Sequence, residues 1–303
     1  MKNTLSTYPP KQIILAGIVL CILALVNRAF AEDGSWIIDG PWTIFNPPVM
    51  TVQGIDGDNI VGEYHGPMGF PRGFLFDGTT WTILNMPGAT GTSAYGIDGG
   101  NIVGQYDGTH GFLYNDTTWT ILDMPGADRT WAYSIDGENI VGSYSDTSGA
   151  LHGFLYDGST WTPLNAPGSY QTWARGIDGS NIVGSYYDAS GEHGFIYDGT
   201  NWTTIGVRMV CGIDGKNIVG RSGNKGFLYD GTNWTYFYMG LNSTTATDID
   251  GYNIAGYSNT MIETSTGFIY TIPEPATLML LGLGFTQILR RKRHNPPSAD
   301  KSQ

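Results

Sequence analysis

The sequence predicts an all-β fold built from six copies of one four-stranded unit. The string Ile-Asp-Gly-x-Asn-Ile-(Val/Ala)-Gly recurs every 36 to 42 residues, beginning at Ile55, Ile97, Ile135, Ile177, Ile213 and Ile249. A second string, Gly-Phe-(Leu/Ile)-(Tyr/Phe), begins at Gly73, Gly111, Gly153, Gly194, Gly226 and Gly267. The composition agrees, because 44 glycines and 13% aromatic residues disfavour helical bundles and suit a turn-rich β protein.

Both strings have the residue order of a β-hairpin. In the copy at residues 154–162, β-forming residues flank an Asp-Gly turn, and glycine readily takes the positive φ that tight hairpin turns require. The first string likewise places Asp-Gly-x-Asn between two short apolar strands. Each unit therefore holds four short strands, and neighbouring units must stack to bury the faces of their small sheets.

The two ends of the repeat region predict that the units close into a ring. The first five units continue into Trp-Thr, at Trp81, Trp119, Trp161, Trp202 and Trp234. The sixth unit lacks this strand, whereas an isolated Trp42-Thr43-Ile44 precedes the first unit. We therefore predict a six-bladed β-propeller over residues 32–271, closed by the N-terminal strand, because a closed ring leaves few strand edges exposed. A β-solenoid is the alternative, and residues 36–40 could supply a second N-terminal strand to the ring.

Residues 1–31 have the features of a secretory signal peptide. Lys2 and Lys11 form a basic start, an apolar run covers residues 13–26, and Ala29 and Ala31 supply the small-x-small pattern of a cleavage site. At about 1.5 Å per residue the run spans roughly 21 Å, short of the roughly 30 Å core of a bilayer. We expect cleavage after Ala31, and an uncleaved N-terminal anchor is the alternative.

The C-terminal region resembles a known sorting signal. Pro273-Glu274-Pro275 is followed by an apolar run over residues 276–289 and by the basic cluster Arg290, Arg291, Lys292 and Arg293. This order resembles the PEP-CTERM tail that exosortase systems read in Gram-negative bacteria. The resemblance covers residues 272–293, before a tail over 294–303. It implies the export machinery and an exosortase-type processing enzyme as partners, with transient membrane association through a short helix. A plain membrane anchor is the alternative, because the basic cluster would stop transfer at the cytoplasmic face.

The repeats resemble a family of exported proteins. His-Gly-Phe-Leu-Tyr-Asp-Gly at residues 152–158, together with the first string, is similar to the HAF-type extracellular repeat, with Gly in place of that family's Ala. The likeness spans residues 51–270. It implies a protein that is secreted or located at the cell envelope or outer surface, and it implies no defined activity. Asp-Gly-Thr-x-Trp also resembles, weakly, the Asp-box of sialidase propellers.

Charge and cysteine content exclude two further possibilities. Residues 32–272 carry seven Lys and Arg against 25 Asp and Glu, a net charge of −18. Such an acidic body excludes nucleic acid as a partner, because binding to phosphates needs clustered cations. After removal of the signal peptide, Cys211 is the one cysteine left, so no internal disulfide can form. We expect Cys211 to be a small buried hydrophobic residue.

Positions that vary between the repeats are the candidate binding residues. Three residues before each first string, small residues suit an innermost strand, and the next position varies: Gln53, Tyr95, Tyr133, Arg175, Cys211 and Thr247. We expect Tyr95, Trp131, Tyr133, Trp173 and Arg175 to lie around one side of the central opening. Aromatic faces beside an arginine suit a carbohydrate or a carboxylated sugar. Packing between blades is the alternative role of these side chains.

Polar residues that recur in every unit are expected to stabilise turns. We expect each aspartate of the first string to close its own turn with the nearby Asn, and scattered weak calcium sites are the alternative. These aspartates are Asp56, Asp98, Asp136, Asp178, Asp214 and Asp250. The residues before Gly-Phe are expected to pair with a neighbouring turn Asp or a backbone carbonyl, and a ring of anion-facing donors is the alternative. These residues are Arg72, His110, His152, His193, Lys225 and Thr266, and they predict no metal site, because equivalent positions of different blades do not converge.

The sequence contains no motif of a known catalytic machinery. Nucleophile elbow, His-Glu-x-x-His, phosphate loop and dinucleotide fingerprint are all absent from the 303 residues. We therefore predict no catalytic residue and no cofactor. The expected function is a non-enzymatic binding or structural role, in the extracellular polysaccharide or biofilm matrix or in surface recognition. A polysaccharide-active glycosidase or lyase is the alternative.

Overall fold

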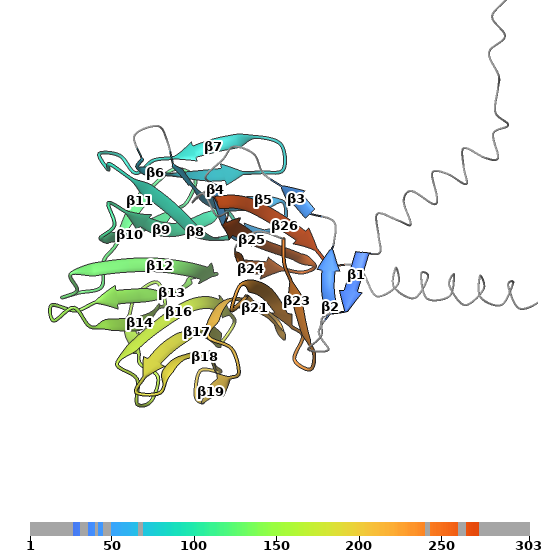
Figure 1. The fold of residues 1–303 in the computed structure, drawn as a ribbon. Coiled ribbons are helices and arrows are strands. Elements are labelled where there is room, and N and C mark those ends of the chain that lie inside the picture. Colours follow the sequence, from blue (N-terminus) through green and yellow to red (C-terminus); the bar gives the residue numbers. More distant parts are fainter. Residues whose placement is uncertain are drawn as a thin grey trace, which may run out of the picture.

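The computed structural model describes residues 50–65, 69–239, 243–259 and 265–272, with three N-terminal strands, β1 (Asn27–Phe30), β2 (Trp36–Asp39) and β3 (Trp42–Ile44). These residues form six sheets arranged radially about one axis, five of four strands and one of six (Figure 1). All the secondary structure assigned in these ranges is β-strand. The predicted six-bladed β-propeller is confirmed, and the alternative solenoid is wrong.

Within each blade the strands follow one another from the axis outwards. The innermost strands are β4 (Met50–Asp56), β8 (Thr92–Asp98), β12 (Arg129–Asp136), β16 (Gln171–Asp178), β20 (Met209–Asp214) and β24 (Ser243–Asp250). The second strands are β5 (Asn59–His65), β9 (Asn101–Tyr106), β13 (Asn139–Ser145), β17 (Asn181–Asp188), β21 (Asn217–Ser222) and β25 (Asn253–Asn259). Consecutive innermost strands contact one another, and β24 contacts β4, so the ring is closed.

The outer half of each blade is a second hairpin. The third strands are β6 (Pro71–Phe76), β10 (His110–Tyr114), β14 (Leu151–Tyr156), β18 (Gly191–Tyr197), β22 (Lys225–Tyr229) and β26 (Ser265–Thr271). The outermost strands of the first five blades are β7 (Trp81–Leu84), β11 (Trp119–Leu122), β15 (Trp161–Leu164), β19 (Trp202–Ile205) and β23 (Trp234–Phe237). The Trp-Thr strands predicted from the sequence are therefore the rim of the propeller.

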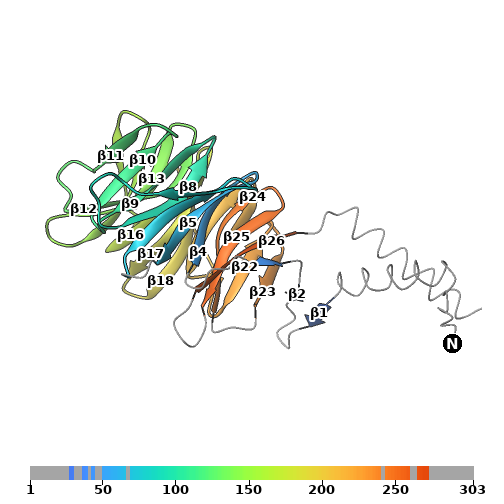
Figure 2. The ribbon, with the colours of Figure 1, turned by 90° about the horizontal axis from the view of Figure 1, so that it is seen from above.

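The N-terminal strand β3 completes the sixth blade, as predicted. It pairs antiparallel with β26, with Ile44 opposite Phe268 and Trp42 opposite Tyr270. The second N-terminal strand, β2, does not join the same blade. It pairs in parallel with β23, with Ile37 opposite Tyr236, and so extends the fifth blade (Figures 1 and 2).

The segments expected to act in export lie largely outside the described residues. The exception is β1, which pairs with β2 and falls inside the predicted signal peptide, so cleavage after Ala31 would remove it. The remainder of that peptide, the PEP-CTERM segment from Pro273 and the tail over 294–303 are not described. None of the described residues belongs to a helix long and apolar enough to traverse a bilayer.

The hydrophobic core is divided into layers between neighbouring blades. Between the first two blades, Leu84, Ala94, Ile97 and Phe112 pack together and are each less than 7% exposed. The phenylalanine of the second string lies over the last glycine of the first: a Cβ on Gly104 would come within 2.8 Å of the Phe112 ring. This contact explains why the two strings recur together, since the phenylalanine side chain needs a partner without a side chain.

The aspartates of the first string link each blade to the next, which corrects the expectation that each closes its own turn. The Gly57 N–H donates to Asp250 Oδ2 at 2.7 Å, across the junction of the last and first blades. The same bond joins Gly99 to Asp56, Gly137 to Asp98, Gly179 to Asp136, Gly215 to Asp178 and Gly251 to Asp214, at 2.6 to 2.9 Å. Each turn glycine has a φ between 54° and 59°, the left-handed conformation that glycine adopts readily. In this conformation its N–H donates to the aspartate of the preceding blade. The six bonds form a complete ring.

The histidines before Gly-Phe pair with aspartates, as expected. A ring nitrogen of His110 lies 2.9 Å from a carboxylate oxygen of Asp123. The same contact joins His152 to Asp146 and His193 to Asp188, at 3.1 Å in both pairs. The Ser190 hydroxyl, with a smaller contribution from His193, lowers the pKa of Asp188 to about 2. These pairs stabilise loops at the ends of the blades.

Candidate functional site

Each innermost strand contains one β-bulge at the position that varies between the repeats. The pairing of β12 with β13 shifts between Ala132 and Ser134, which leaves Tyr133 without a partner. The other five innermost strands shift at the same place. A bulge inserts one extra residue and turns its side chain in a new direction. The residues so displaced are Gln53, Tyr95, Tyr133, Arg175, Cys211 and Thr247.

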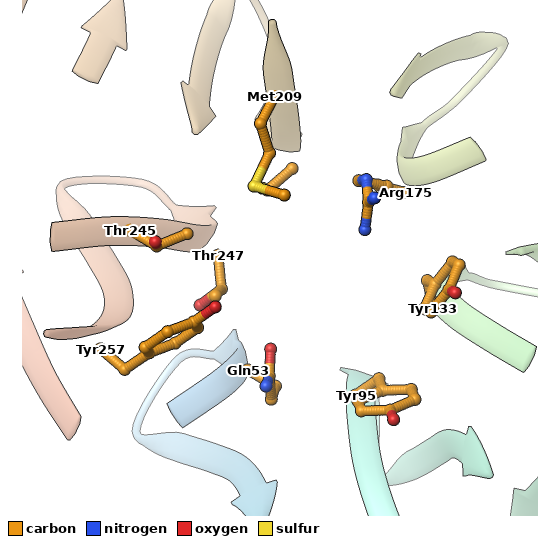
Figure 3. A pocket seen from close by; sticks show the side chains of 9 residues that line it. Gln53, Tyr95, Tyr133, Arg175, Met209, Thr245, Thr247 and Tyr257 are labelled. Atoms are coloured by element: carbon orange, nitrogen blue, oxygen red, sulfur yellow. The ribbon is translucent and has the colours of Figure 1, made fainter. Parts of the chain in front are cut away.

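The six bulged residues converge on a single cavity at the propeller axis. This axial cavity has a volume of about 230 Å³, and its wall is completed by Met209, Thr245 and Tyr257. Figure 3 shows side chains from all six blades directed at one opening, with Arg175, Tyr133 and Tyr95 next to one another on one side. The fold therefore gathers at one point residues that are spread over about 200 positions of the chain.

Three of the five predicted binding residues form one continuous part of the cavity wall. The rings of Tyr95 and Tyr133 have their centroids 5.6 Å apart. The guanidinium carbon of Arg175 lies 5.7 Å from the centroid of the Tyr133 ring. Cation–π attraction of this kind holds an arginine in place while its outer N–H groups stay able to donate.

The two predicted tryptophans lie beside this wall and are not among the nine residues that line the cavity. Trp173 lies 5.9 Å from the guanidinium of Arg175, on the same strand, and packs edge-on against Tyr187 at 5.6 Å. Trp131 is opposite Ser143 in the ladder, two residues before Tyr133. Trp173 thus helps to orient Arg175.

Hydrogen bonds fix the tyrosines but leave Arg175 incompletely bonded. The Tyr95 hydroxyl accepts from Gln105 Nε2 at 2.9 Å, and the Tyr133 hydroxyl accepts from Ser143 Oγ at 3.2 Å. In the fourth blade the equivalent serine is Ser185, but the bulged residue is Arg175. The Ser185 hydroxyl and the Arg175 Nε are both buried and have no hydrogen-bond partner among the described residues. An unsatisfied buried polar group costs about 1–3 kcal/mol, so these two atoms lower the stability of the free protein.

Arg175 is the one charged residue among the nine that line the cavity. Burial raises the pKa of Tyr95, and burial likewise raises the pKa of Cys211 to about 11. Both groups are therefore neutral at neutral pH. The prediction that Cys211 is buried is confirmed, since it is 9% exposed. The axial cavity thus carries a positive charge, whereas residues 32–272 as a whole carry a net negative charge.

The carboxyl group of Asp248 stands next to the cavity wall. Asp248 follows the lining residue Thr247 and occupies the position that is glycine or serine in the other five blades. Its Oδ2 accepts from the Ile55 N–H at 3.0 Å. Asp248 keeps some accessible surface, but the protein surrounding its carboxyl raises the pKa to about 7, mainly by desolvation.

Sequence reasoning missed Met209, Thr245 and Tyr257 as parts of the wall. Met209 and Thr245 stand two residues before a bulged position, as Trp131 and Trp173 do, so their spacing was a usable signal. Tyr257 comes from the second strand β25, opposite Thr245, and only the strand register reveals it. Within the ranges that the structure describes, no group of three or more His, Cys, Asp or Glu is arranged to hold a metal ion.

Comparison with known families identifies the C-terminal segment. Residues 271–293 match the model of the PEP-CTERM protein-sorting motif. The motif supports export to the cell surface and processing by an exosortase. The resemblance of the repeats to the HAF type remains a prediction. A comparison with the curated proteins gave no match.

Comparison with solved structures gives other propellers of low sequence identity. A triple arginine-to-alanine mutant of AofleA from Arthrobotrys oligospora is 12% identical, with a TM-score of 0.50 over 83% of this chain and 92% of that one. The six-bladed Aleuria aurantia lectin is 12% identical, with a TM-score of 0.45 over 78% and 99%. A Trypanosoma rangeli sialidase mutant is 11% identical, with a TM-score of 0.44 over 88% and 60%. At these identities the likeness concerns the fold alone and assigns no function to this chain.

Proposed function

We propose that this is an exported binding protein whose axial cavity takes one acidic sugar residue of an extracellular polysaccharide. The observation that carries the proposal is Arg175, the one charged side chain in the cavity wall, with its Nε buried and without a partner. A guanidinium binds a carboxylate through charge-assisted, often bidentate hydrogen bonds. A uronic acid offers this carboxylate on a ring of suitable size.

The remaining wall suits the body of a sugar. The Tyr133 and Tyr95 rings present aromatic faces beside Arg175. Across the cavity, Gln53 contributes an amide group and Thr247 a hydroxyl group (Figure 3). The volume of about 230 Å³ lies below the roughly 300–1,000 Å³ of pockets for drug-sized ligands. A single sugar residue therefore suits the cavity better than a longer segment of chain.

The charge of the protein favours selective binding. Residues 32–272 carry a net charge of −18, which repels polyanions from most of the surface. An acidic polysaccharide would thus bind where the cation is, at the axial cavity. The sorting motif supports delivery to the surface, where such a polymer is found outside the cell, and this is the basis for proposing a role in the matrix or in surface recognition.

A polysaccharide-active hydrolase or lyase is the second candidate, and Asp248 is the observation that favours it. A carboxyl with a pKa of about 7 can donate a proton at neutral pH. Glycoside hydrolysis, however, uses two carboxyl groups about 5–10 Å apart, and the nine lining residues include none. Turnover of an acidic polysaccharide that is abolished in Asp248→Asn would favour the enzyme over the binding protein.

Calorimetric titration with glucuronic acid tests the binding role. We expect glucuronic acid to bind and glucose to bind more weakly, because only the former has a carboxylate for Arg175. Replacing Arg175 by alanine should weaken glucuronate binding about tenfold or more, since hydrogen bonds to charged groups contribute about 1.5–3 kcal/mol. Arg129→Ala, an exposed arginine outside the cavity wall, is the matched control. Equal affinity of wild type and Arg175→Ala for glucuronate would refute the proposal.

A further inference from the structure

A second hollow lies where the first blade meets the second. This junction groove has a volume of about 410 Å³ and is lined by residues that include Phe70, Pro71, Gly91, Gln105 and Asp107. Phe70 precedes β6 of the first blade, which begins at Pro71. Gln105 lies near the end of β9 in the second blade, and Asp107 follows that strand. Gln105 lines the groove, and Tyr95 lines the axial cavity. Gln105 Nε2 donates a hydrogen bond to the Tyr95 hydroxyl, so these two side chains form the wall between the two hollows.

The groove is lined in part by a position that varies between the blades. At the position of Gln105 the other blades carry Glu63, Ser143, Ser185, Arg221 and Tyr257. The hairpin from β9 to β10 is short, with only residues 107–109 between the strands. Asp107 makes this turn with a φ of +53°, and its Oδ1 accepts from the backbone N–H groups of Thr90 and Gly91 at 2.7 and 3.1 Å. These bonds hold the turn and the loop before β8 as one preformed wall.

The groove combines an exposed aromatic ring with hydrogen-bond acceptors. The Phe70 side chain is 49% exposed, unusual for a large apolar residue. Gln105 lines the groove, and its Oε1 is buried and has no partner among the described residues. Asp107 adds a carboxylate, and none of the groove's lining residues is cationic. Aromatic faces pack against sugar rings, and acceptors bind sugar hydroxyls, but a carboxylate repels an anion.

We propose that the junction groove is a second saccharide subsite, which takes a neutral sugar residue. The inference rests on the proposed function, because it treats the groove as the continuation of one polysaccharide site across the Gln105–Tyr95 wall. The axial cavity then takes an acidic residue at Arg175, and the groove takes a neutral residue on Phe70. A polymer that contains both acidic and neutral sugars fits this pair of subsites.

Titration with neutral oligosaccharides, followed by amide NMR, tests the groove directly. The probes are cellotetraose, xylotetraose and mannotetraose at millimolar concentration. We expect at least one of them to shift the amide signals of Gly91 and Gly108, which line the groove. Phe70→Ala should weaken that binding roughly three- to tenfold, the loss expected for one aromatic contact. Tyr252→Ala is the matched control, because Tyr252 is equally exposed at 49% but lies on a turn of the sixth blade.

The outcomes separate this inference from the proposed function. If no neutral probe shifts Gly91 or Gly108, or if Phe70→Ala binds as tightly as Tyr252→Ala, the groove is not a saccharide subsite. The proposal for the axial cavity is then still tested by comparing glucuronate binding of the wild type and Arg175→Ala. In the opposite outcome, Arg175→Ala leaves glucuronate binding unchanged while Phe70→Ala weakens tetrasaccharide binding. That result would support the saccharide subsite in the junction groove and refute the acidic-sugar site in the axial cavity. Phe70 is exposed, so its replacement leaves the folded core intact.

Discussion

The carboxylate of Asp250, at the end of the last innermost strand, accepts a hydrogen bond of 2.7 Å from the N–H of Gly57, 193 residues earlier in the chain. The same two blades share two more bonds: the Thr247 hydroxyl donates to the Val52 carbonyl at 3.0 Å, and the Ile55 N–H donates to Asp248. The junction of the last and first blades is thus bonded as the other junctions are, with additional contacts at the axis.

Replacing Asp250 by alanine should lower the free energy of unfolding by about 1 kcal/mol, the usual net contribution of one hydrogen bond. Asp136→Ala, which removes the equivalent bond between the third and fourth blades, should have a similar effect. Asp58→Ala, an exposed neighbour on the turn that follows β4, serves as the control. Urea unfolding followed by tryptophan fluorescence measures the difference. If Asp250→Ala unfolds at the same urea concentration as Asp58→Ala, the ring of bonds does not stabilise the fold.

Removal of β3 should destabilise the sixth blade selectively. A chain beginning at residue 46 leaves the outer edge of β26 unpaired, whereas a chain beginning at residue 40 keeps β3 and loses only β1 and β2. We expect the shorter chain to melt roughly 5–10 °C lower, because several backbone hydrogen bonds are lost. Hydrogen exchange should show lost protection in β26 first. Equal melting temperatures for the two chains would mean that the N-terminal strand does not close the ring.

Stability should depend on pH through Asp248. Its pKa is about 7 in the folded protein, against an ordinary value of 3.8, so folding takes up a proton between these values. The free energy of unfolding should therefore fall as pH rises from about 4 to about 7 and change little above that. The effect is at most a few kcal/mol, since one pKa unit corresponds to about 1.4 kcal/mol.

The variant Asp248→Asn isolates this effect. An amide oxygen can still accept from the Ile55 N–H and carries no charge to bury, so the variant should exceed wild type in stability at pH 8 and equal it near pH 4. Urea unfolding at both pH values measures the difference. A wild-type protein and a variant with parallel pH profiles would show that the Asp248 carboxyl ionises normally.

Maturation should remove both ends of the chain. The intact mass of the exported product should correspond to a chain that begins at Glu32 and ends near Pro275, because the predicted cleavage follows Ala31 and the sorting motif covers residues 271–293. Glu274→Ala should retain the C-terminal segment. A wild-type product with the mass of residues 32–303 would show that the motif is not processed.

The fold could be predicted because its signals are local and repeated. Each Asp-Gly turn and each Gly-Phe strand specifies a hairpin within a few residues, and six copies fix the number of blades. The Asp partners could not be predicted in the same way. Asp56 bonds to Gly99, 43 residues away in the next blade, and no local pattern distinguishes this bond from one within its own turn.

The axial cavity could be predicted in part. Variation among the repeats identified Tyr95, Tyr133 and Arg175. Residues that maintain the fold recur in every repeat, whereas residues that line a binding site can differ from one repeat to the next. The bulges depend on backbone register, which the sequence does not reveal, and they bring Tyr133 to the cavity wall. The junction groove was not expected at all, since it depends on the close approach of two loops from different blades.

A crystal structure of the mature protein with glucuronic acid tests the central claim most directly. We expect the sugar in the axial cavity, with its carboxylate bonded to the Arg175 guanidinium and its ring against Tyr133. Glucuronic acid bound only elsewhere on the propeller, with the axial cavity free of sugar, would contradict the account.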